Sequence, residues 1–281
     1  MRRTSIFRKT LGDQRWQIFG YGLAMAAMAS TSVWLWPSVR DTLQTFEIPA
    51  ALKALLGRDV DFTTAAGYLS GRYFSWTIIL LVVYAVVAGT GAIAGEENSG
   101  TIDLLLAQPV TRTSVLLQKL AAATAGVIII AMSGYVGFLI SVPTVSIAVS
   151  LGDLAIACGN MIPVSFFFLA MALWCGVVAP NRGAAAGMAI GVTVVTYFLY
   201  TLSNGVDSLE RLQYASPFYY YGSGLSLTQG IVWWHVGTLL AVAALFCALS
   251  LRTFDRRDIS PGGASDVSAG AMLRRALAIH P

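Results

Sequence analysis

Long apolar runs alternate with short polar connections along most of this chain. A helix needs about 20 mostly apolar residues to cross the hydrocarbon core of a bilayer. Six runs of that length contain no Asp, Glu, Lys or Arg, and they cover residues 16–37, 73–94, 120–142, 154–179, 183–204 and 231–251. The pattern therefore predicts an all-α polytopic membrane protein, with six transmembrane helices in one membrane domain over residues 16–251. An even number of spans places both ends of the chain on the same side of the membrane.

The composition leads to the same class of protein. Of the 281 residues, 56% are hydrophobic and 11% are charged. Soluble domains carry about 25% charged residues, so this chain is too apolar to build a water-facing surface. The net charge of +4 would favour nucleic acid as the partner of a soluble protein. Here the basic residues flank apolar runs, and we expect a lipid bilayer and no nucleic acid.

The distribution of Lys and Arg predicts the orientation of the spans. The two ends of the chain and the connections 95–119 and 180–182 hold 13 of the 18 Lys and Arg residues. The connections on the other side, 38–72, 143–153 and 205–230, hold the remaining five. Connections on the cytoplasmic side carry an excess of basic residues. Both termini and the 95–119 connection are therefore predicted to be cytoplasmic.

The two ends of the chain lie outside the predicted membrane domain. Within residues 1–15, Ile6, Phe7 and Leu11 stand among basic residues, which predicts either a short helix in the cytoplasmic interface or a plain basic flank. The tail, 252–281, contains a stretch rich in Gly, Ser and Ala and is predicted to be disordered. The first apolar run is longer than the apolar region of a signal peptide, about 7–15 residues, so we interpret it as a span.

Ionisable residues are scarce within the predicted spans. Ion-coupled carriers need such groups at membrane depth, because the coupling ion or proton binds there. His235 is the one candidate in the six runs, and its neighbours Trp233 and Trp234 favour anchoring at the membrane interface. Asn160 and Asn204 are expected to form hydrogen bonds between helices or to cap helices, and not to act as ligands. These observations disfavour ion-coupled transport.

The sequence also lacks the patterns expected of an enzyme. Metal-ligand spacing of His, Cys and Asp, a nucleophile elbow and a phosphate-binding loop are all absent. The three cysteines, Cys158, Cys175 and Cys247, lie in apolar runs and are interpreted as small packing residues. The glycines within 89–95 loosely resemble a dinucleotide-binding turn, but their place in a span favours helix packing. We predict a chain without enzymatic activity, a metal site or a cofactor of its own.

A stripe of glycines marks the fifth predicted span. Gly183, Gly187 and Gly191 recur every four residues, so they lie on one face of a helix. Small residues at this spacing let a second helix approach closely. The partner is either another helix of this chain, which is the default expectation, or a second subunit.

The polar segment 95–119 contrasts with the two apolar runs around it. Asn98 and Ser99 are good N-caps, Asp103 suits the positive end of a helix, and Pro109 ends it. The sequence therefore predicts a short helix in this connection. Its body is too apolar to lie in water and needs a partner surface.

The next helix is predicted to begin within the same segment, after Pro109. Thr111 or Thr113 can cap it, and it enters the membrane past Lys119. A short helix held between two spans in this way can push or pull on both.

This polar segment resembles the cytoplasmic-loop motif of the ABC-2 type permeases. The matching residues are Glu96, Gly100, Thr101, Asp103, Leu105, Leu106, Pro109 and Arg112. Asp103 stands where many family members have Glu. The six-span layout and the segment 216–220, Ser-Pro-Phe-Tyr-Tyr, also match the family, so the resemblance covers nearly the whole chain.

The resemblance implies a division of labour between subunits. ABC-2 permeases are non-catalytic membrane subunits of ATP-driven transporters, mostly exporters, in the prokaryotic cell membrane. A separate ABC ATPase, which binds ATP and Mg, would dock on the loop helix, and a second permease copy or a paralogue would complete the pathway. The alternative function is an ion-coupled secondary carrier or another membrane-embedded assembly factor.

The resemblance also implies a gate on the outer side. In such permeases the region that corresponds to 214–221 forms short helices that dip into the membrane near the exit. Tyr214, Pro217, Phe218 and Tyr219 are therefore candidates for an outer gate, and a plain aromatic belt is the alternative. The outer connections are too short for the large periplasmic domain of the macrolide-exporter-like branch.

Overall fold

The computed structural model describes residues 5–45, 61–98, 111–222 and 226–256. Within these ranges the chain is helical and contains no strand. Six helices or continuous helical segments are long and apolar enough to cross a membrane. They are α2 (Arg15–Thr45), the segment α4 (Ala65–Leu69), η1 (Ser70–Phe74) and α5 (Ser75–Asn98), then α7 (Arg112–Ser141), α8 (Leu151–Val178), α9 (Arg182–Gly205) and α12 (Trp233–Arg256). The prediction of an all-α protein with six spans is confirmed.

Shorter helices cover several of the connections. They are α1 (Ile6–Asp13), η2 (Val142–Thr144), η3 (Asp207–Ala215), α10 (Pro217–Tyr221) and α11 (Ser226–Gln229). The helix predicted near the N-terminus is therefore present as α1, which packs against α7.

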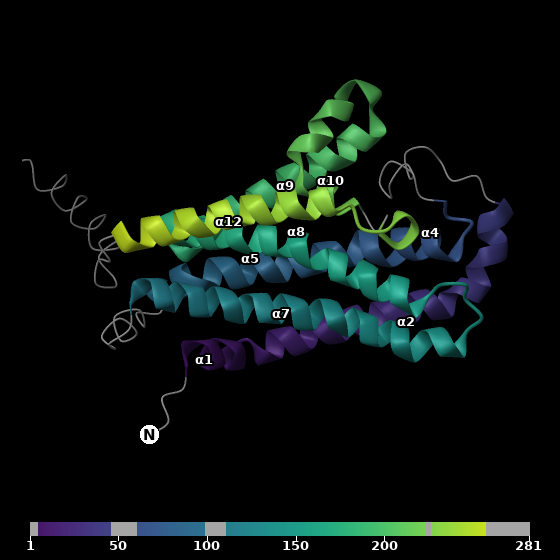
Figure 1. The fold of residues 1–281 in the computed structure, drawn as a ribbon, viewed down its shortest axis with the longest axis horizontal. Coiled ribbons are helices and arrows are strands. Elements are labelled where there is room, and N and C mark those ends of the chain that lie inside the picture. Colours follow the sequence, from purple (N-terminus) through teal and green to yellow (C-terminus); the bar gives the residue numbers. More distant parts are fainter. Residues whose placement is uncertain (1–4, 46–60, 99–110, 223–225, 257–281) are drawn as a thin grey trace, which may run out of the picture.

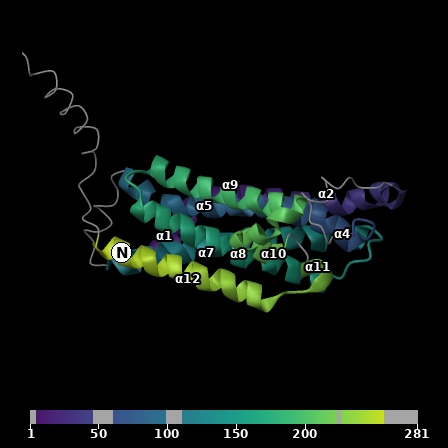
Figure 2. The same cartoon turned by 90° about the horizontal axis from the view of Figure 1, so that it is seen from above.

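The spans form an elongated bundle with two distinct ends (Figure 1). One end gathers α1, the end of α5, the start of α7 and the end of α12; we call it the terminal end, because both described termini lie there. The opposite end, with α4, α10 and α11, is called the distal end. Figure 2 shows α9 and α12 on opposite sides of the bundle, with α8 between them. The last part of α9 and η3 lean away from the other spans (Figure 1).

The centre of the bundle is the pair α5 and α8. In both spans, 67% of the most apolar stretch is buried, compared with 17% in α9 and in α12. Gly89 allows the two backbones to approach, because a Cβ atom there would lie 2.7 Å from the carbonyl oxygen of Leu169. Gly176 on α8 also lies close to α5, since its Cβ would be 3.2 Å from the oxygen of Thr90. The prediction that glycines within 89–95 serve helix packing holds for Gly89.

Glycines of α7 leave room for aromatic side chains from α5 and from the turn η1 before it. The hydroxyl of Tyr84 lies against Gly126, and the hydroxyl of Tyr73 lies against Gly134. Both tyrosines are fully buried, and any side chain on these glycines would occupy the space of a phenol. This arrangement aligns α7 along α5.

Several helices extend beyond the apolar runs that predicted them. The second span begins at Ala65 rather than at residue 73, because Thr64 caps it by accepting a hydrogen bond from the N–H of Gly67 at 3.0 Å. The segment then continues through the π-helical turn η1. The third span begins at Arg112 rather than at residue 120. Apolar content alone marks the part of a helix that lipid surrounds, whereas caps mark where the helix begins.

We expect Gly89→Ala to destabilise the bundle, while Gly91→Ala serves as the matched control. The new methyl group at residue 89 would collide with the backbone of α8, whereas a Cβ at residue 91 would meet no atom within 4 Å. Overpacking of this kind costs about 1–3 kcal/mol. Thermal unfolding of the purified protein in detergent measures the effect. Equal unfolding temperatures for the two variants would contradict the close packing of α5 and α8.

Candidate functional site

The start of α7 is held to the end of α12 at the terminal end. Thr111 caps α7 by accepting a hydrogen bond from the N–H of Ser114 at 3.2 Å, as the sequence allowed. The Arg112 guanidinium donates to the carbonyl oxygen of Phe254 at 3.3 Å. The Thr113 hydroxyl lies 3.4 Å from the nearer carboxylate oxygen of Asp255. Residues 142 positions apart are thus joined beside the polar connection.

Lys119 joins α7 to α5 at the same end. Its ammonium group donates to the carbonyl oxygen of Ala92 at 2.7 Å, and the side chain is 3% exposed. Lys119 lies within α7, as the predicted cap at Thr111 or Thr113 implies, whereas its burial was not predicted. A buried ammonium group needs such acceptors, because losing its water is costly. Apolar patterning treats each Lys as a boundary and therefore missed this contact.

The N-terminal helices are also fixed to this end of the bundle. The N–H of Phe7 donates to the side-chain oxygen of Gln118 at 3.3 Å. The Tyr84 hydroxyl donates to the side-chain oxygen of Gln14 at 3.0 Å. Helices α1, α5, α7 and α12 are therefore linked to one another around the two ends of the polar connection.

Most of the predicted ATPase-coupling residues lie outside the described part of the chain. They are Gly100, Thr101, Asp103, Leu105, Leu106 and Pro109, together with the side chain of Glu96. The predicted tail after residue 256 lies outside it as well. Arg112 is the member of the coupling set whose contacts the structure describes.

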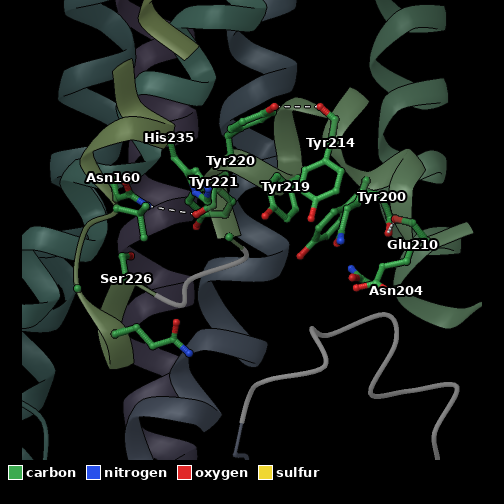
Figure 3. Close-up of a pocket in the computed structure, with 16 residues that line it drawn as sticks. Asn160, Tyr200, Asn204, Glu210, Tyr214, Tyr219, Tyr220, Tyr221, Ser226 and His235 are labelled. Atoms are coloured by element: carbon green, nitrogen blue, oxygen red, sulfur yellow. Dashed lines mark hydrogen bonds between the residues drawn. The ribbon is translucent and has the colours of Figure 1, made fainter. Parts of the chain in front are cut away.

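A cavity of about 500 Å³ opens at the distal end (Figure 3). Its described walls come from α8, α9, η3, α10, α11 and the start of α12. The lining residues are Asn160, Tyr200, Ser203, Asn204, Glu210, Gln213, Tyr214, Tyr219, Tyr220, Tyr221, Gly222, Ser226, Gln229, Gly230, Val232 and His235. Two of the four outer-gate candidates, Tyr214 and Tyr219, are among them.

Helix α10 is anchored within the bundle through Ser216. The Ser216 hydroxyl accepts from the N–H of Phe218 at 3.2 Å and donates to the carbonyl oxygen of Thr196 at 2.7 Å. Pro217 occupies the first turn, where no intrahelical N–H is needed. Gly222 ends the helix with a φ of 70°, a conformation that favours glycine. A five-residue helix is thereby fixed at both ends.

The aromatic residues of α10 do not form a simple exposed belt. Phe218 is buried between Phe168 and Tyr197, with ring centroids 5.1 and 5.4 Å away. Tyr219 contacts Tyr214, and their ring centroids are 4.9 Å apart. Burial, and then the neighbouring Tyr214, raise the pKa of the Tyr219 phenol. Tyr219 therefore faces the cavity as an uncharged group.

Hydrogen bonds connect α10 to α8 and to the last residue of η1. Asn160 donates to the carbonyl oxygen of Tyr221 at 3.2 Å, so the prediction that it bonds between helices is confirmed. The Tyr221 hydroxyl donates to the carbonyl oxygen of Phe74 at 3.2 Å. Burial raises the pKa of the Tyr221 phenol well above its ordinary value, which keeps this donor protonated.

His235 lies in an aromatic cluster at the start of α12. Its ring centroid is 5.3 Å from those of both Tyr219 and Tyr220, and 4.5 Å from that of Trp234. Trp233 and Trp234 are 74% and 59% exposed, as the interfacial anchoring interpretation requires. In the described residues, no three His, Cys, Asp or Glu side chains gather as metal ligands.

The glycine stripe of α9 faces away from the bundle. A Cβ atom at Gly187 or Gly191 would meet no atom within 4 Å, and at Gly183 it would meet the side chain of Asn181. The inner face of the helix carries Ala185 and Ala189, which are fully buried. The default expectation from the sequence was that the stripe packs against another helix of this chain. For the described residues, that expectation is wrong.

Comparison with known proteins decides the family. The family model described as ABC-2 family transporter protein matches residues 18–259, from the first span through the last. This chain belongs to that family. The expected resemblance is thus confirmed, and the chain is a multi-pass membrane subunit of an ABC transporter.

Two curated relatives carry the same kind of description. "Probable ABC transporter permease protein NosY" of Pseudomonas aeruginosa is 28% identical over 209 residues, which cover 71% of this chain and 68% of the relative. The protein of the same name from Stutzerimonas stutzeri is 28% identical over 208 residues, covering 70% and 66%. The aligned part spans about two thirds of each relative.

The distal cavity of this ABC-2 permease could not be found from the sequence. Its lining residues come from segments separated by up to 75 positions, between Asn160 and His235. Tyr200, Ser203 and Gln229 carry no local pattern that distinguishes them. The aromatic run before the last span was the one available signal, and it led to Tyr214 and Tyr219.

We expect Ser216→Ala to loosen α10, with Ser208→Ala as the control. The first change removes both the helix cap and the bond to Thr196, and loss of a cap costs about 1 kcal/mol. Ser208 is exposed on η3. Thermal unfolding in detergent should place Ser216→Ala several degrees below the control. Identical curves would show that α10 does not depend on Ser216.

Proposed function

We propose that this ABC-2 permease is the membrane subunit of an exporter in a prokaryotic cell membrane. A separate ABC ATPase binds ATP and Mg, and hydrolysis of that ATP supplies the energy for transport. The observation that carries the proposal is the linkage of three spans around the polar connection. Lys119 bonds α7 to α5, and Arg112 bonds α7 to α12. An ATPase docked on that connection can therefore act on three spans together.

The charge distribution supports a cytoplasmic position for the terminal end. The basic residues described at that end are Arg8, Lys9, Arg15, Arg112, Lys119, Arg182, Arg252 and Arg256. Those described in the distal half are Arg40, Arg72 and Arg211. Positive residues favour the cytoplasmic side. In this orientation the polar connection meets the cytosol, where an ATPase has access to ATP.

Helix α12 supplies a path from the connection to the distal cavity. Its last turn is bonded to Arg112 and Thr113. Its first turn carries His235, which packs on Tyr219 and Tyr220. A displacement of the connection would therefore be carried along one helix to α10. This supports assigning Tyr214, Pro217, Phe218 and Tyr219 to an outer gate.

The outer face of α9 supports pairing with a second permease copy. The stripe of Gly183, Gly187 and Gly191 is not covered by any described part of this chain. Large apolar side chains beside it, such as Val195 and Phe198, are 57% and 58% exposed. Glycines at this spacing allow two helices to pack backbone against backbone in lipid. We assign this face to the dimer contact.

If the ATPase docks on the polar connection, Leu105→Asp combined with Leu106→Asp should weaken its binding to the permease. The tagged permease is purified from its native membranes, and the co-purifying ABC ATPase is quantified together with its ATP hydrolysis. Two charges in an apolar docking helix should reduce the retained ATPase about tenfold or more. The control is Leu212→Asp on η3, where the side chain is already 44% exposed. Undiminished ATPase in the double variant would refute docking at this helix.

The energy source is tested by measuring transport in vesicles that contain the permease and its ATPase. In vesicles, a catalytically inactive ATPase should abolish net transport, whereas His235→Gln and a proton ionophore should leave the ATP-driven process in place. Transport that survives the inactive ATPase but stops with the ionophore would instead establish an ion-coupled carrier.

The dimer contact predicts that Gly187→Leu yields a folded monomer. A bulky side chain on the stripe would separate the two α9 helices, whereas within its own chain a Cβ at residue 187 would meet no described atom within 4 Å. Gly237→Leu is the control, because Gly237 is an equally uncovered glycine on α12. Light scattering in detergent gives the mass of each variant. A dimeric Gly187→Leu protein would move the contact elsewhere.

A further inference from the structure

The distal cavity has a lining of unusual charge. Among the described residues that line it, none is Lys or Arg, and Glu210 is the one carboxylate. Arg211 follows Glu210 in the chain but is not part of the lining. With His235 neutral, an anion would therefore meet no full positive charge from these residues, while a cation would meet one negative charge. Electrostatics favour a positively charged occupant.

The aromatic residues strengthen that preference. Five tyrosines line the cavity: Tyr200, Tyr214, Tyr219, Tyr220 and Tyr221. The rings of Tyr214 and Tyr219 meet edge to face, with 71° between their planes. Figure 3 shows Tyr200, Tyr214 and Tyr219 together, beside Asn204 and Glu210. The faces of aromatic rings attract cations, and cages of such rings recognise substituted ammonium groups.

The remaining lining suits the polar part of a small molecule. Gln213 and Gln229 supply amide groups, and Ser203 and Ser226 supply hydroxyls. Ser226 is 6% exposed, and its hydroxyl has no hydrogen-bond partner among the described residues. A buried hydroxyl without a partner is costly, and a bound polar group would satisfy it. The volume, about 500 Å³, falls within the range of small-molecule sites, about 300–1,000 Å³.

We infer that this cavity binds a small organic cation, with its ammonium group between Tyr200, Tyr214 and Tyr219 and near Glu210. The same group occurs on free solutes and on phospholipid headgroups. This inference goes beyond the proposed function and does not depend on an ATPase. Binding can therefore be measured on the permease alone, and a negative result would leave the energy source untouched.

The test compares choline with 3,3-dimethylbutanol, which has the same shape but no charge. Equilibrium dialysis is carried out with the purified full chain in detergent at about pH 8, where an ordinary histidine is neutral. Choline should bind at least about tenfold more tightly than the uncharged isostere. Equal binding of the two, tighter binding of glucose, or no choline binding up to about 50 mM would overturn the inference.

Variants locate the site within the protein. Tyr219→Leu should weaken choline binding about tenfold. Glu210→Gln should weaken it about threefold, because the carboxylate is exposed and screened. Asp153→Asn and Tyr135→Leu are the controls, since neither residue lines the cavity. Glu210→Gln changes an exposed surface group, so it remains informative if Tyr219→Leu fails to fold. Unchanged choline affinity in a folded Glu210→Gln protein would place the cation elsewhere.

A second arm separates the two sources of the ammonium group. Choline binding is repeated in nanodiscs of phosphatidylglycerol, with and without phosphatidylethanolamine. A lower apparent choline affinity with phosphatidylethanolamine indicates that a lipid headgroup occupies the cavity. An unchanged affinity indicates a soluble cation.

Discussion

The backbone contact between α5 and α8 is the constraint on which the rest of the structure depends. Gly89 brings the two helices closer together than a Cβ atom at its position would allow, and Gly176 adds a second close backbone approach. Every other span packs on this pair or on α7 beside it. Lipid offers no hydrophobic gain for bringing helices together, so contact area and backbone proximity have to supply the attraction. The two spans that carry these glycines are accordingly the most buried ones.

Polar contacts join helices at both ends of the bundle, and at the terminal end some of these contacts have charged donors. At the terminal end, charged donors reach backbone oxygens, as Lys119 and Arg112 do. At the distal end, neutral hydroxyl and amide groups bond to backbone, as Ser216, Asn160 and Tyr221 do. Charge-assisted bonds are the stronger class. The hydrogen bonds described between helices at the distal end are therefore of the weaker class, as expected for the part that we assign to a gate.

The sequence was sufficient to predict the architecture, because a helix that crosses lipid needs a long run of apolar residues. Runs of about 20 apolar residues have few alternatives to a membrane span, and all six were found. The helix cap at Thr111 was predictable for a local reason, since a cap bonds to the next few residues. The contacts of Lys119 and of the glycines were harder to predict from the sequence. Nothing in the sequence says that Gly89 touches α8 while Gly91 touches nothing, or that the regular stripe of α9 points outward.

The π-helical turn η1 has a consequence for how the second span faces its neighbours. The N–H and hydroxyl of Ser75 both donate to the carbonyl oxygen of Ser70, five positions earlier. Such a turn holds one residue more than a regular helix, and one residue corresponds to about 100° of rotation. Tyr68 reaches Trp36 of α2, with ring centroids 5.3 Å apart, on the far side of this turn from the α5–α8 contact. In a regular helix, one added residue would turn Tyr68 away from Trp36 by about that angle. The wider π turn takes up the extra residue, so Tyr68 and the α5–α8 contact keep their directions.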